Sequence, residues 1–135
     1  MERDPKAVVE RFLDDGWDPV AQRWDTGVIA ECFDMERYHS HTWGAGLVET
    51  GRMGEFFAGF GRELEQLTEA LVAEGDRVVY HASWRATHVG PLLGVAATGR
   101  TVEVNHVEIW RVEDGRIVEH WGGVGEAAHL YAQIT

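Results

Sequence analysis

The chain has 135 residues, of which 44% are hydrophobic, and a formal net charge of −11 at pH 7. This length suits one domain with a real core, and no apolar run approaches the roughly 20 residues of a membrane helix. The acidic balance argues against nucleic acid as a partner, because phosphate contacts need clustered Lys and Arg. The single Cys32 excludes an internal disulfide. Together with an N-terminus that lacks a signal-peptide pattern, it favours a cytoplasmic protein.

The first half of the chain predicts helices. Asp4 before Pro5 is typical of an N-cap followed by proline at the first helical position, and apolar residues at helical spacing continue until Gly16. A short second helix is expected over 26–33. A stripe of apolar residues with a period of 3.6 predicts a third helix over 52–67.

The second half predicts strands. They are expected over 68–74, 77–89, 101–113 and 116–123, after a short extended piece over 38–43 and before a last short helix over 125–134. Asp114-Gly115 between two β-rich runs is the strongest short-range signal for a hairpin. Helices followed by a run of antiparallel strands indicate the α+β class. We expect one domain over 1–135, a cone made by a curved, mostly antiparallel sheet around about three N-terminal helices, with an apolar cavity.

Four short motifs follow one another between Gly75 and Gln133. They are a strand ending in Thr-His-x-Gly, a loop ending in Thr-Gly-Arg, an Asp-Gly hairpin, and Ile-x-Glu-x-Trp. The positions concerned are Thr87, His88, Gly90, Gly94, Thr98, Gly99, Arg111, Asp114, Gly115, Ile117, Glu119 and Trp121. This order resembles the SnoaL-like polyketide cyclase family, which has the nuclear transport factor 2-like fold. The resemblance covers the last half of the chain well and the first half loosely.

The resemblance implies an enzyme, a cyclase without cofactor that acts on a polyketide-type natural product. The family's usual reaction is an intramolecular aldol closure, in which a base removes a proton alpha to a carbonyl and an acid protonates the new alkoxide. The protein folds the substrate and excludes water. The resemblance also implies a small hydrophobic substrate and no metal. Family members that open epoxides, remove water, isomerise or hydroxylate are alternatives.

The chain departs from the family at one position. Cyclases of the family usually place an acid/base Asp four residues after the Trp, where this chain has Gly125. Another titratable group must then transfer the proton if the protein is an enzyme. Glu126, one residue further on, is one candidate. A non-catalytic protein that binds a hydrophobic ligand, and a hydrolase or isomerase of the same fold, stay open as alternatives.

Histidines are the other candidates, because the unperturbed pKa of imidazole is about 6.5. On the predicted strand over 101–113, His106 shares a face with Val104 and Trp110. Burial there would keep the ring neutral and able to exchange a proton. We predict His106 as the main acid/base, with His41 and His120 as further catalytic residues.

Aromatic and polar residues are expected to line the cavity. The predicted substrate-binding residues are Tyr38, Trp43, Phe57, Tyr80, Trp84, His88, Trp110, Trp121 and Glu126. His39 and His41 would point the same way in an extended segment, but no spaced third ligand accompanies them, so no metal site is predicted. Glu108 is interpreted as a solvated charge and Glu119 as a structural partner of Arg111.

The predicted strand over 101–113 carries large apolar residues on both faces. Val107 and Ile109 lie on the face that would point away from the cavity. A second copy of the sheet is the simplest cover for that outer face, so we predict a homodimer.

Overall fold

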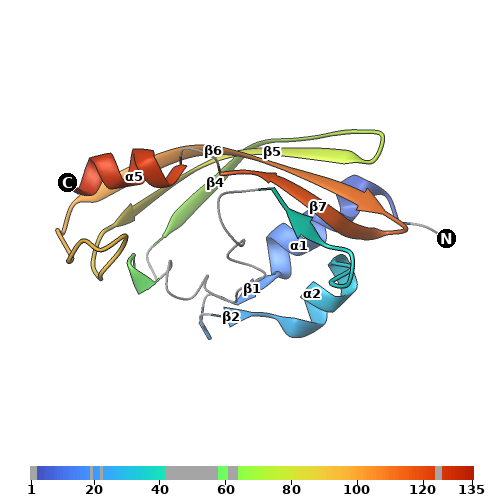
Figure 1. The fold of residues 1–135 in the computed structure, drawn as a ribbon, viewed down its shortest axis with the longest axis horizontal. Helices are drawn as coiled ribbons and strands as arrows, with labels where there is room; N and C mark the ends of the chain where they lie inside the picture. Colours follow the sequence, from blue (N-terminus) through green and yellow to red (C-terminus); the bar gives the residue numbers. More distant parts are fainter. Residues whose placement is uncertain (1–2, 19, 22, 42–57, 61–63, 124–125) are drawn as a thin grey trace.

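The computed structural model describes residues 3–18, 20–21, 23–41, 58–60, 64–123 and 126–135, the last range without the side chains of Glu126 and Ala127 (Figure 1). Within these ranges the chain forms α1 (Pro5–Asp15), β1 (Trp17–Asp18), β2 (Arg23–Trp24), α2 (Thr26–Cys32), β3 (His39–Ser40), β4 (Glu65–Glu74), β5 (Arg77–Thr87), β6 (Thr101–Glu113), β7 (Arg116–Gly122) and α5 (Glu126–Ile134). The α+β class is therefore confirmed. No helix in these ranges is long and apolar enough to cross a membrane.

Helix α1 begins as the sequence predicts. The Asp4 carboxylate accepts a hydrogen bond from the Ala7 N–H at 3.3 Å, and Pro5 takes the first helical position. The buried side of α1 carries Val8, Val9 and Phe12. The Phe12 ring meets Trp110 of β6 edge to face, with 5.9 Å between ring centroids. This face fixes α1 against the sheet.

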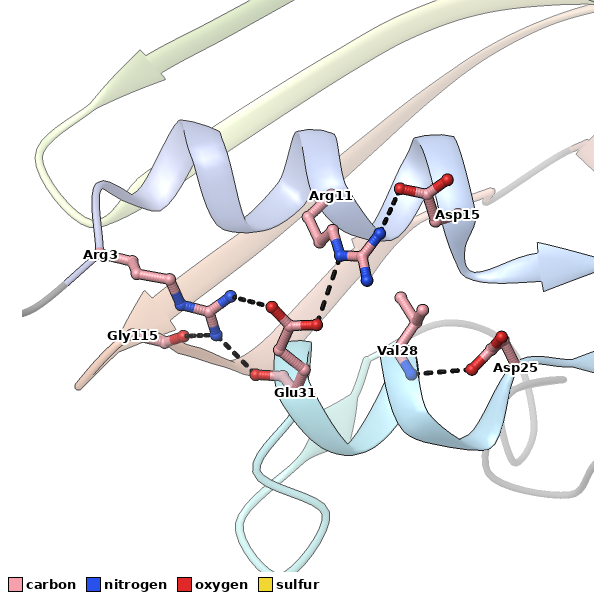
Figure 2. A network of polar contacts seen from close by, with 7 residues as sticks. All are labelled: Arg3, Arg11, Asp15, Asp25, Val28, Glu31 and Gly115. Carbon is pink, nitrogen blue, oxygen red and sulfur yellow. Dashed lines mark hydrogen bonds and ion pairs between the residues drawn. The ribbon is translucent and has the colours of Figure 1, made fainter.

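Helix α2 is tied to α1 by charged side chains (Figure 2). Arg3 donates to the carboxylate and the main-chain carbonyl of Glu31, and also to the Gly115 carbonyl in the β6–β7 turn at 3.0 Å. Arg11 pairs with the same Glu31 and with Asp15. These side chains are exposed, so each pair contributes little to stability. Their effect is mainly to align the hairpin with the two helices.

The larger sheet has the strand order β3-β7-β6-β5-β4. Adjacent strands from β4 to β7 pair antiparallel, and the β6–β7 turn has φ of 53° at Asp114 and 76° at Gly115. Positive φ at both central residues is the type I′ geometry that Asp-Gly favours, so the predicted hairpin is confirmed. Strand β3 joins parallel to β7, with Ser40 opposite His120. This short pairing brings a segment from the first half of the chain beside the last strand.

The prediction that the third helix continues to residue 67 is wrong. Most of the range 52–67 lies outside the described residues, but Glu65 and Leu67 belong to β4 and pair with Arg85 and Ser83 of β5. Leu67 is 63% exposed, so the apolar period that suggested a helix does not mark a buried stripe here. Pairing with β5 satisfies the main-chain hydrogen bonds of this segment and overrides its helical pattern.

One face of the sheet, here called the inner face, carries two separate apolar clusters. The first packs α1 and α2 against the sheet and contains Val8, Val9, Phe12, Val28, Cys32, Phe33, Val78, Tyr80, Ala82, Trp110, Val112 and Ile117. The second packs α5 against β5 and β6 and contains Phe60, Trp84, Ala86, Leu92, Val102, Val104, Leu130 and Ile134. Along β6, His106 and Glu108 lie between these clusters. The predicted alternation of β5 and β6 is thus confirmed, and it places two polar side chains in an apolar face.

Candidate active site on the inner face

A carboxylate joins two histidines at the centre of the inner face. Glu108 Oε2 lies 2.7 Å from His120 Nε2, and Glu108 Oε1 lies 3.4 Å from His106 Nδ1. On the far side of the His120 ring, Nδ1 lies 2.9 Å from Ser40 Oγ. The four side chains form one polar chain in the order His106, Glu108, His120, Ser40, which we call the Glu108 relay.

The register of three adjacent strands assembles this relay. His120 of β7 lies opposite Trp110 of β6 and opposite Ser40 of β3. Glu108 lies opposite Gly122, so its carboxylate can lean across β7 toward His120. A Cβ atom on Gly122 would come within 2.2 Å of Glu108 Oε2, and the φ of this residue is 136°. Glycine is therefore required at 122 by both the space for the carboxylate and the backbone conformation.

The relay is largely removed from solvent. The side chains of His106, Glu108 and His120 are 10%, 15% and 14% exposed. Burial by itself would raise the pKa of the Glu108 carboxyl, but the hydrogen bonds from His106 and His120 together outweigh it and hold the pKa below its ordinary value. Glu108 is thus an ionised carboxylate that accepts hydrogen bonds from both rings.

Aromatic rings enclose the two histidines. The Tyr80 ring meets His106 edge to face at 5.7 Å, and Trp110 lies tilted against His120 at 5.5 Å. The Tyr80 hydroxyl accepts a hydrogen bond from the Gln66 amide. Such surroundings have a low local dielectric, in which hydrogen bonds to charged groups are stronger than in water.

His41 and Trp121 lie on the opposite, outer face of the sheet. His41 Nε2 is 2.9 Å from Glu119 Oε2, and its ring stacks on Trp121 with 4.9 Å between centroids. Glu119 also accepts a hydrogen bond from Arg111, as the sequence suggests. The prediction that His41 accompanies His106 is wrong, because neighbours along β3 alternate between faces and Ser40 is the residue that points inward.

The other predicted site residues are dispersed. Trp84 lies in the second apolar cluster, and His88 is fully buried with its Nδ1 2.9 Å from Thr98 Oγ1. Tyr38 packs on Phe33 beside the first cluster. The remaining predicted positions, Trp43, Phe57, Gly125 and the Glu126 side chain, lie outside what the structure describes.

Two residues of the relay are absent from the sequence-based prediction. The interpretation of Glu108 as a solvated charge is wrong, because its side chain is 15% exposed and shares the inward face with His106 and Trp110. No sequence pattern points to Ser40, because its contact with His120 depends on the parallel pairing of β3 with β7. Within the described part of the chain, no group of three or more His, Cys, Asp or Glu is placed to hold a metal ion.

A concave feature lies away from the relay. It is an apolar pocket beside α2, lined by Trp24, Thr26, Ile29, Ala30 and Met35. None of these side chains titrates near neutral pH. The pocket therefore does not compete with the relay as a place for acid/base chemistry.

Comparison with known proteins places the whole chain in one family. The sequence profile of the SnoaL-like polyketide cyclase family matches residues 7–134. A proposed SnoaL-like polyketide cyclase from Jannaschia sp. CCS1 is 27% identical with a TM-score of 0.76, and the match covers 99% of this chain and 96% of that one. AclR, a proposed hydroxylase from Streptomyces galilaeus, is 26% identical with a TM-score of 0.71, covering 96% and 94%.

A further solved structure shares the fold at lower identity. IdmH from Streptomyces antibioticus, a proposed polyketide cyclase, is 22% identical with a TM-score of 0.70, and the match covers 96% of this chain and 97% of that one. A search of curated proteins finds no match. The family profile spans nearly the full length, so this chain belongs to the SnoaL-like polyketide cyclase family.

Proposed function

We propose that the protein closes a ring in a polyketide-type substrate by general acid/base catalysis, with His106 and His120 as the proton-transferring pair. Membership of the family supports a cyclase-type enzymatic function. The observation that carries the finer proposal is the Glu108 carboxylate between two imidazoles on an apolar face. This arrangement supplies titratable groups in a chain that has Gly125 where the family's cyclases usually have Asp.

The chemistry of an aldol closure divides between the two rings. A neutral imidazole removes the proton alpha to a carbonyl, the resulting enolate attacks a second carbonyl of the same molecule, and an imidazolium protonates the new alkoxide. Within this pair, His106 faces Glu108 through Nδ1. Glu108 stabilises the charge that passes between the histidines, as a carboxylate does for an imidazolium.

The apolar surroundings complete the proposed site. Tyr80 and Trp110, both buried, pack against the two rings and make their surroundings apolar. A protein that only holds a hydrophobic ligand needs no buried carboxylate, and burying one is costly without a role. The relay therefore favours an enzyme over a passive binding protein.

Hydroxylation is the second candidate, because AclR at 26% identity is a proposed hydroxylase. Product mass separates the reactions. A ring closure leaves the substrate mass unchanged, a dehydration removes one water, and a hydroxylation adds one oxygen. Incubation of the full chain with an aromatic polyketone ester, followed by liquid chromatography and mass spectrometry, is expected to give an isomer of unchanged mass with a new absorbance spectrum.

The same assay tests the residues. His106→Ala and His120→Ala should each lower the rate about 10²–10⁴-fold, the usual contribution of a positioned acid or base. His81→Ala is the matched control, because His81 lies on the outer face of β5 against Glu69 and should keep the rate of the unmodified protein. Full activity in both inner-face variants would overturn the proposal.

A further inference from the structure

Ser40 stands at the end of the Glu108 relay in the position of a nucleophile. Its Oγ lies 2.9 Å from His120 Nδ1, and the other nitrogen of that ring lies 2.7 Å from Glu108 Oε2. A hydroxyl, an imidazole and a carboxylate in series, each within hydrogen-bond reach of the next, is the arrangement that activates serine in acyl-transfer enzymes. The ring closure proposed above gives Ser40 no part.

The direction of each hydrogen bond follows from the chemistry of the groups. An ionised carboxylate only accepts hydrogen bonds, so the proton of a neutral His120 ring lies on Nε2, toward Glu108. Nδ1 is then an acceptor, and the Ser40 hydroxyl donates to it. This is the protonation state in which an imidazole can take the serine proton as general base.

Strand pairing holds the three side chains rigidly. They come from the adjacent strands β3, β7 and β6, and the His41 N–H donates to the His120 carbonyl at 2.7 Å beside Ser40. Sites built on strands are positioned more exactly than sites on loops. Ser40 itself is only 9% exposed, so a small acyl group suits this position better than a large one.

We propose that Ser40 is a nucleophile that accepts the acyl group of small carboxylic esters, with His120 as its base and Glu108 as the residue that orients the ring. Ser40 Oγ forms a bond to the carbonyl carbon while its proton passes to His120 Nδ1. The bond to the leaving alcohol breaks, and the leaving oxygen takes that proton. Water then attacks the acyl-serine, gives one proton to Nδ1, and the Ser40 oxygen recovers it. Ester and water are consumed, and acid and alcohol are formed.

This activity uses Glu108 and His120 in common with ring closure, but Ser40 belongs to it alone. The two proposals can therefore fail separately. Acyl transfer to Ser40 together with ring closure in the unmodified protein supports both of them. Ring closure without acyl transfer to Ser40 in the unmodified protein leaves only the cyclase, and acyl transfer without ring closure leaves only the acyl-transfer activity.

The experiment uses the full chain with p-nitrophenyl acetate. Release of p-nitrophenolate is followed by absorbance, and the protein is analysed by intact mass and peptide mapping after acid quenching. The expected result is one added acetyl group, mapped to Ser40. Ser40→Ala should lose both the adduct and the release, and His120→Gln should slow the release about 10²–10⁴-fold. Ser83→Ala is the matched control, because Ser83 lies on the outer face, bonded to Glu69.

Two results would overturn the inference. An acetyl group mapped to another residue of the unmodified protein, or no adduct at all, shows that Ser40 is not the acceptor. This test uses the unmodified protein, so it does not depend on the folding of a variant. Release of p-nitrophenolate that persists in a folded Ser40→Ala protein shows that the imidazoles attack the ester directly. Far-UV circular dichroism of each variant establishes that it is folded.

Discussion

His120 Nε2 lies 2.7 Å from Glu108 Oε2, across the β6–β7 ladder and inside an apolar face of the sheet. The two side chains come from different strands. A β-bulge between Arg111 and Val112 shifts the β6–β7 register set at the turn, and so places His120 opposite Trp110. Gly122 leaves room for the carboxylate. Removing the charge of Glu108, protonating its carboxylate, or filling the space at Gly122 should each have a measurable effect.

Glu108→Gln keeps the size of the side chain and removes its charge. An imidazolium beside it then loses a charge-assisted hydrogen bond, which is worth roughly 1.5–3 kcal/mol, so ring closure should slow by about 10- to 100-fold. The rate at pH 7 is the measurement. Glu119→Gln is the matched control, because Glu119 pairs with Arg111 and His41 on the outer face. An unchanged rate in Glu108→Gln would contradict a role for its charge.

The stability of the fold should depend on Glu108 in acid. The pKa of this carboxyl is held below its ordinary value in the folded protein. A lowered pKa contributes stability that is present above the unfolded pKa, about 4.3 for Glu, and is lost as the pH falls through the folded pKa. Denaturant unfolding at pH 7 and at steps below pH 4.5 should show the unmodified protein losing stability more steeply than Glu108→Gln. Parallel losses in the two proteins would show that Glu108 does not contribute.

Gly122→Ala should damage both stability and activity. The added Cβ would lie 2.2 Å from Glu108 Oε2 and 2.5 Å from the Val107 carbonyl, on a backbone with positive φ. We expect a loss of about 1–3 kcal/mol in the free energy of unfolding, and a slower ring closure because Glu108 is displaced. Gly75→Ala is the control that separates backbone strain from displacement of Glu108, since Gly75 also has positive φ but open space around its Cβ position. The Gly75→Ala protein should close the ring at the unmodified rate.

The outer face of the sheet should form a homodimer. Val107 of β6 is 46% exposed there and Val72 of β4 is 58% exposed. A second copy of this face would remove these side chains from water. Light scattering at micromolar concentration should give the mass of two chains, and Val107→Lys should give the mass of one. A monomeric unmodified protein would show this prediction to be wrong.

The sequence by itself determined the features that depend on local chemistry. Asp4 and Pro5 start α1 because a carboxylate satisfies main-chain N–H groups there and proline needs none. The Asp114-Gly115 pair forms the hairpin because its residues tolerate positive φ. The alternation along β6 has a period of two, so it places His106 on the inward face before any partner strand is known. The same alternation places Glu108 on the inward face.

The tertiary structure alone decided how distant segments meet. Ser40 and His120 are 80 positions apart, and only the parallel pairing of β3 with β7 brings their side chains within 2.9 Å. A shift of one residue in that pairing would have turned His41 inward instead, because side chains alternate along a strand. The strand that begins at Glu65 likewise depends on the open edge of β5. Local patterns fix the direction in which a side chain points along its own strand, whereas the strand register fixes which side chain it meets.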